Sequence, residues 1–198
     1  MVTKAEKTSE YIIQMVAPIF NKHGYSGTSM SDLTKATSLT KGAIYGNFKN
    51  KEELAILAFT YNVQRVVDQI KVHLSQTKSP IQQLYKLTSF YRSYRVFTME
   101  NGGCPVINIG VDANHDNMIL LVKVREIITR LQRGIAKMIL AGIEAGEIKE
   151  SVDADKYGRY FFTIIEGGVF LMTTMDDDRF LTESMDRIDD IITKELAV

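Results

Sequence analysis

Apolar residues recur along most of the chain at the spacing of one face of an α-helix. Between about Thr8 and His23 they form a single stripe: Ile12, Val16, Ile19, Phe20 and His23. Sustained period-two alternation is missing, and the 198 residues include only three prolines, Pro18, Pro80 and Pro105. The pattern predicts an all-α protein, with a kink at Pro18 because proline removes one helical amide.

Caps and polar breaks divide this pattern into nine predicted helices. Ser29 with Asp32 reads as a capping box, Thr40 as an N-cap, and Asn50 with Glu53 as a similar helix start. The expected helices are 8–23, 30–37, 41–48, one from about 50 to 74, one from 80 to the stop at 101–103, a short one from 105, one from about 114–117 to 142–146, one capped by Ser151 or Asp153, and one after the acidic turn 176–178. We therefore expect a three-helix head, residues 1–50, followed by a helical body, residues 51–198.

The segment SLTKGAIYGNFKNK, residues 38–51, has the residue types of a DNA-recognition helix. Two short helices joined by a tight turn form a helix-turn-helix, in which the start of the second helix meets base edges in the major groove. Ile44 and Phe48 suffice to anchor it, and the other side chains are small or polar. The candidate DNA contacts are Ser29, Thr40, Lys41, Gly42, Ala43, Tyr45, Lys49 and Lys51. The alternative is an ordinary capped, solvated helix in a bundle.

The order and spacing from Ile12 to Leu54 resemble the DNA-binding head of the tetracycline-repressor (TetR) family. The resemblance lies in a first helix ending in Phe and Gly-Tyr, a capped second helix, then Thr-Lys-Gly-x-Ile-Tyr-x-x-Phe and Asn-Lys-Glu-Glu-Leu. It implies a homodimeric regulator that binds a palindromic operator and responds to a small molecule bound in the body. By position it places Thr40, Lys41, Gly42, Ala43 and Tyr45 on DNA and Lys51 on a backbone phosphate. Ser38 departs from the glycine common in the family's turn.

Charge and composition add limited information. The 24 basic and 24 acidic residues cancel, but residues 1–52 carry seven Lys and four acids, which has the sign expected of a phosphate-facing head. We expect a cytoplasmic protein, because no stretch has the length of a membrane span or the apolar core of a secretory signal. Cys104 is interpreted as a small buried residue rather than a thiol sensor, and His23 as a core or boundary histidine.

Two further surfaces are expected in the body. The last two predicted helices are candidates for dimerisation, because a helix that is apolar on more than one side needs a second partner. The interface candidates are Tyr160, Ile164, Gly167, Gly168, Leu171, Ile188, Ile191 and Ile192. Apolar walls with a few polar groups suit a small-molecule site. The ligand candidates are Phe90, Tyr91, Tyr94, Arg95, Asn108, Asp112, Phe162 and Glu166. Glu166 could instead pair with Arg95 or Arg159.

The sequence thus favours a ligand-responsive DNA-binding regulator, most simply a repressor. The alternative is a small helical ligand-binding protein without specific DNA binding. An enzyme is a distant third reading, because no phosphate-binding loop, nucleophile elbow or paired-acid arrangement occurs. No cofactor is expected, and His73 and His115 have no metal-ligand spacing.

Overall fold

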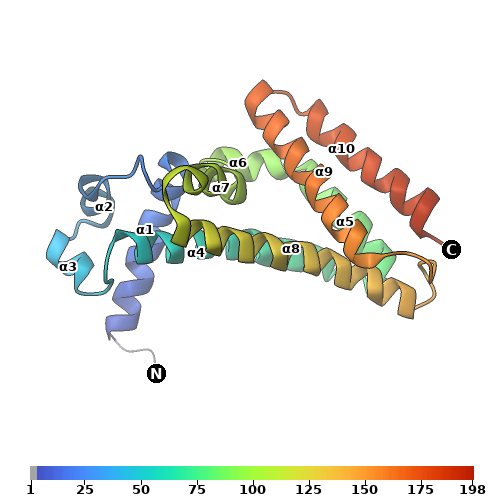
Figure 1. Ribbon diagram of the computed structural model, residues 1–198, viewed down its shortest axis with the longest axis horizontal. Helices are drawn as coiled ribbons and strands as arrows, with labels where there is room; N and C mark the ends of the chain where they lie inside the picture. Colours follow the sequence, from blue (N-terminus) through green and yellow to red (C-terminus); the bar gives the residue numbers. More distant parts are fainter. Residues whose placement is uncertain (1–3) are drawn as a thin grey trace. The chain divides into compact units, whose positions relative to one another are not determined.

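The computed structural model describes the backbone of residues 4–198 and the side chains of residues 6–115 and 117–198. Ten α-helices and one closing π-turn account for its regular structure, so the all-α prediction is confirmed (Figure 1). The elements are α1 Lys4–His23, α2 Met30–Thr37, α3 Lys41–Tyr45, α4 Lys51–Leu74, α5 Pro80–Arg92, α6 Tyr94–Asn101, α7 Pro105–Asp116, α8 Met118–Glu144, α9 Ala154–Met175, α10 Arg179–Ile191 and η1 Ile192–Leu196.

The predicted fifth helix is in fact two helices, α5 and α6, which raises the helix count from nine to ten. The break lies at Ser93, where the backbone leaves the α region at φ −102° and ψ 7°. The Ser93 hydroxyl donates to the carbonyl of Phe90 at 3.0 Å. Serine can satisfy the backbone in this way outside a regular helix, and an apolar periodicity that continues past Ser93 conceals the break.

Other helix boundaries follow the predicted caps closely. Ser29 and Asp32 form the expected capping box, and the Thr40 hydroxyl accepts from the Ala43 amide at 3.2 Å. Asn50 accepts from the Glu53 amide at 2.8 Å, whereas the Glu53 carboxylate reaches the Lys49 amide at 2.6 Å. α1 continues through Pro18 without interruption. α3 is shorter than predicted and ends at Tyr45, because Gly46 caps it.

The contacts divide the chain into two compact units that differ from the predicted division at residue 50. The first unit comprises the chain through Val66 together with Met99–Arg125, and the second comprises Val67–Thr98 together with Glu126–Val198. The unit boundaries therefore fall inside α4, α6 and α8. The division into a DNA-binding head, 1–50, and a body, 51–198, is accordingly a functional proposal and not the boundary between the compact units.

The core of the first unit joins α1, α2, α3 and the start of α4. It contains Ile12, Val16, Ala17, Phe20, Leu33, Ile44, Phe48, Leu54, Ala55 and Ala58. The predicted α1 stripe holds for Ile12, Val16 and Phe20, but His23 is exposed, which corrects its interpretation as a core or boundary residue.

The second unit contains an antiparallel pair formed by α9 and α10, and α10 also packs on α5 (Figure 1). Leu181, Met185, Ile188 and Ile191 supply the buried stripe of α10. Arg92 of α5 donates to Asp186 and to Asp189 of α10, at 2.7 Å in each case. Apolar burial and charge-assisted hydrogen bonds thus fix α10 against α5.

Candidate nucleic-acid interface

α3 is held by two buried side chains and leaves its remaining side chains in solvent. Ile44 is fully buried and Phe48, just after the helix, is 4% exposed. Lys41, Gly42, Ala43 and Tyr45 are exposed. A five-residue helix with one buried position cannot be stable alone, so the core beneath it and the Thr40 cap hold its conformation. The result is a polar helix start presented on a rigid base.

Two neighbouring residues fix the ends of α3. Asn47 donates to the Ala43 carbonyl at 2.9 Å and accepts from the Ser9 hydroxyl of α1 at 3.2 Å. The turn before α3 contains Ser38, with φ 56° and ψ 25°. This left-handed conformation is the one that glycine adopts most readily, so serine keeps the turn geometry at an energetic cost. Sequence reasoning did not identify Asn47, although a polar residue after Gly46 is a signal for a helix end.

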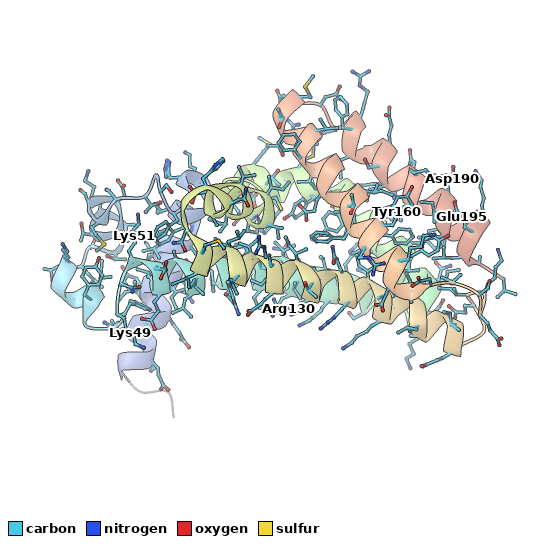
Figure 2. The ribbon with its side chains drawn as sticks, in the orientation of Figure 1. Lys49, Lys51, Arg130, Tyr160, Asp190 and Glu195 are labelled. Atoms are coloured by element: carbon cyan, nitrogen blue, oxygen red, sulfur yellow. The ribbon has the colours of Figure 1, made fainter. Side chains whose placement is uncertain are left out.

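The exposed side chains of α3 and of the turn that follows it carry ammonium and hydroxyl groups, which can bind phosphate oxygens and base edges. The Lys41 ammonium lies 5.9 Å from the centre of the Tyr45 ring, so these residues share one side of α3. Lys49 is exposed in the turn before α4, and Lys51 begins α4 (Figure 2). The Ser29 hydroxyl accepts from the Asp32 amide at 3.2 Å and donates to the Asp32 carboxylate at 2.6 Å, so its first role is to cap α2.

Lys51 is bonded within the first unit. Its ammonium donates to the Tyr25 carbonyl at 2.6 Å and lies 4.4 Å from the centre of the Tyr25 ring. Burial lowers the Lys51 pKa, and the carboxylates of Asp112 and Asp32 oppose that shift. An ammonium has three N–H donors, so one bond to Tyr25 leaves capacity for a phosphate oxygen.

Asp112 holds the same turn from α7. Its carboxylate accepts from the Tyr25 amide at 2.6 Å and from the Ser26 amide at 3.3 Å. Asn108, one turn earlier on α7, donates to the carbonyls of Asn21 and Gly102 at 2.9 and 2.8 Å. The polar groups of these two ligand candidates join α7 to the end of α1 and the turn after it, and their ligand role stays a prediction.

Asn21 completes this junction, and sequence reasoning missed it. Its amide donates to the carbonyls of Asn101 and Gly103 at 2.6 and 2.9 Å, and its side chain is buried. An asparagine on the inner side of an apolar helix is the signal that could have marked it, because buried amides need polar partners.

The remaining ligand candidates lie in the second unit. Phe90, Tyr91 and Tyr94 form one cluster of rings, with centroid separations of 5.1 to 5.9 Å. Arg95 is paired with Asp176 and Asp178 in the turn between α9 and α10. On α9, Phe162 is buried and Glu166 is half-buried. The structure therefore brings three of the eight candidates into ring contact and engages Arg95 elsewhere.

The eight dimer candidates also separate into two groups. Ile188, Ile191 and Ile192 are at most 1% exposed within the single chain, and Gly168 packs against Ser184 and Leu181 of α10. These four residues are removed from the interface, because their surface is already used inside the subunit. Tyr160, Ile164, Gly167 and Leu171 share the opposite side of α9, where a Cβ added to Gly167 would meet nothing within 4 Å (Figure 2 labels Tyr160).

The residues that the structure describes contain neither a metal-ligand cluster nor a membrane-spanning helix. Among those residues, no group of three or more His, Cys, Asp or Glu side chains could hold a metal ion. None of the helices within residues 4–198 combines the length and apolarity of a membrane span. Cys104 is buried at the start of α7, as expected for a small core residue.

Two family models match the sequence. "Bacterial regulatory proteins, tetR family" matches residues 17–58, which include the exposed α3, and "Tetracyclin repressor-like, C-terminal domain" matches residues 80–188, more than half of the chain. The transcriptional repressor DhaR of Mycobacterium sp. (strain GP1) is 22% identical over 180 residues, which cover 87% of this chain and 88% of DhaR.

Solved structures agree over nearly the full length. A TetR-family transcriptional regulator from Cytophaga hutchinsonii superposes with a TM-score of 0.93 at 31% identity, covering 100% of this chain and 98% of that one. A TetR transcriptional regulator from Chloroflexus aurantiacus J-10-FL gives 0.89 at 31% identity, covering 98% of each chain. With its exposed α3 and both matched regions, this chain belongs to the TetR family and is a DNA-binding transcriptional regulator, not an enzyme.

Proposed function

We propose that the protein is a cytoplasmic repressor that binds a palindromic operator as a homodimer and leaves it when a small molecule binds. The observation that carries the DNA-binding part is the exposed start of α3 on its buried anchors Ile44 and Phe48. Thr40, Lys41, Gly42 and Ala43 would meet base edges, while Tyr45, Lys49 and Lys51 would contact phosphates. Ser29 would contribute from the start of α2.

The homodimer is supported by the side of α9 that its own chain leaves uncovered. Tyr160, Ile164, Gly167 and Leu171 are spaced by four, three and four residues, which is the seam pattern of paired helices. Tyr160 is 46% and Leu171 39% exposed, large fractions for apolar side chains at the same seam. A two-fold dimer through α9 would present two α3 helices, and two-fold symmetry requires a palindromic site.

Release by a small molecule requires that the effector bind more tightly to the form that does not bind DNA. We place the effector site at the contacting rings of Phe90, Tyr91 and Tyr94, with Phe162 and Glu166 as further candidates. Within the first unit, Asp112 of α7 accepts from the Tyr25 amide and Asn108 of α7 donates to the Asn21 carbonyl, so α7 is linked directly to the head.

Selection from randomised double-stranded DNA, followed by anisotropy titration of the enriched site and its scrambled counterpart, tests the proposal. The enriched site should be a palindrome bound at least tenfold more tightly than the scrambled sequence. Replacing Lys49 by alanine should reduce the slope of log affinity against log salt by about one. Lys78→Ala, at an exposed lysine of the second unit, is the matched control.

Equal affinity for the enriched and scrambled DNA would contradict the proposal and favour a helical ligand-binding protein without specific DNA recognition. If the slope of log affinity against log salt is unchanged in Lys49→Ala, Lys49 does not contact a phosphate. The α3 residues would then be replaced one at a time in the same assay.

A further inference from the structure

His73 extends the ring cluster of the second unit by one member. Its imidazole lies 6.2 Å from the Phe90 ring, with the planes inclined at 59°. Phe90 meets Tyr91 edge-on at 5.4 Å, and Tyr94 stacks on Phe97 at 5.2 Å with 10° between the planes. These five rings from α4, α5 and α6 form what we call the ring cluster. It combines a large apolar area with one imidazole.

The Nε2 atom of His73 is buried and has no hydrogen-bond partner. A buried polar atom normally has a partner, because its lost hydration is otherwise uncompensated. The His73, Phe90 and Tyr91 side chains are only half-buried, so the cluster is reachable from its surface. An apolar wall with one unsatisfied polar atom is the usual composition of a small-molecule site.

The two arginines next to these rings in the sequence are already paired, which argues against an anionic ligand. Arg92 and Arg95 alternate with the aromatic residues along the sequence. Arg92 is held by Asp186 and Asp189, and Arg95 by Asp176 and Asp178. Both guanidinium groups are thus paired with carboxylates, and an anionic ligand would have to compete with these aspartates for them.

We propose that His73 is the polar anchor of the effector site and that the effector is an uncharged, ring-containing molecule with a hydroxyl group. A hydroxyl both donates and accepts, so it can satisfy Nε2 in either tautomer of a neutral imidazole. The remainder of the molecule would pack against Phe90, Tyr91 and Tyr94. This assignment deepens the proposed effector response. Ligand binding at His73 stands by itself, and only the ligand's control of DNA binding rests on the proposed function.

Binding of 2-naphthol and of naphthalene to the full-length protein tests the assignment, since the two compounds differ by one hydroxyl. The chain has no tryptophan, so naphthalene-type fluorescence can be followed without tryptophan background. The protein should bind 2-naphthol roughly tenfold more tightly than naphthalene, the usual size of one buried hydrogen bond. In His73→Leu this ratio should fall to about one, and His73→Gln should restore part of it.

His115→Leu, at an exposed histidine of the first unit, is the control and should keep the full ratio. Circular dichroism of each variant separates loss of folding from loss of the anchor. The assignment is overturned if neither compound binds, or if His73→Leu still binds 2-naphthol more tightly than naphthalene. It is also overturned if the unchanged protein binds both compounds equally, which is the result expected where a buried water satisfies Nε2.

Operator titrations of the same preparations distinguish this inference from the proposed function. Intact operator binding together with a lost hydroxyl preference would overturn only the His73 assignment. A retained preference in a protein that does not discriminate operator from scrambled DNA would support the site and overturn the proposed repressor.

Discussion

The Asp112 carboxylate of α7 accepts the backbone amide of Tyr25 at 2.6 Å. It also accepts from Ser26, while Lys51 bonds the carbonyl of Tyr25. Both polar groups of the Tyr25 backbone are therefore held by charged side chains that lie far from it in sequence. The turn between α1 and α2 is thus held by long-range bonds as well as by its own Thr28 hydroxyl, which donates to the Gly24 carbonyl at 2.6 Å.

Asp112→Asn should destabilise the protein by about 1–3 kcal/mol, because an amide accepts these two bonds less strongly than a carboxylate. Urea unfolding at fixed protein concentration measures the effect. Asp68→Asn is the control, since its ion pair with Lys71 is exposed and contributes little. Equal losses in the two variants would show that Asp112 is no more important than a surface charge.

Ser38→Gly should raise the free energy of unfolding by about 0.5–1 kcal/mol, because glycine adopts a positive φ without a steric penalty. Ser31→Gly, at the second residue of α2, should have the opposite effect, since glycine is a poorer helix former than serine. Thermal unfolding of both variants checks the sign. A stabilised Ser31→Gly or a destabilised Ser38→Gly would contradict the strain assigned to the turn.

The Asp32 carboxyl should contribute acid-sensitive stability. Hydrogen bonds from the Ser29 hydroxyl and amide hold the Asp32 pKa below its ordinary value of 3.8. The folded state therefore favours the carboxylate, and this stabilisation is present above pH 3.8 and lost as the pH falls through the folded-state pKa. The difference in urea midpoint between the unchanged protein and Asp32→Asn should shrink below about pH 4.

Ser29→Ala provides the matched test of the cause. Without the hydroxyl, the Asp32 pKa should rise toward 3.8, as followed by NMR titration of the side-chain carboxyl. A pKa that stays unchanged in Ser29→Ala would assign the shift to another group.

Leu171→Lys should dissociate the proposed dimer, because it would place an ammonium in the α9 seam without a partner. Sedimentation velocity should show a dimer for the unchanged protein and a monomer for the variant. Leu140→Lys is the control, since Leu140 is similarly exposed but lies on α8. Dissociation by both variants, or by neither, would contradict an interface centred on α9.

Local chemistry explains why much of the head was predictable. The caps at Ser29 and Thr40 act within three residues, and the anchors Ile44 and Phe48 follow helical spacing. The break at Ser93 was not predictable in this way, because the apolar period continues through it and one serine between Arg92 and Tyr94 does not specify a helix end. The sequence also does not show which distant group forms a hydrogen bond with each buried polar side chain.

The sequence by itself determined the all-α class, the capped recognition segment and the family, because these depend on residue type at short, fixed spacing. Only the tertiary structure decided that Asp112 and Asn108 hold the end of α1, that Ile188, Ile191 and Ile192 are buried inside the subunit, and that the Nε2 atom of His73 has no partner. An apolar stripe specifies that a face is buried, but the identity of the covering surface is set by packing among distant segments.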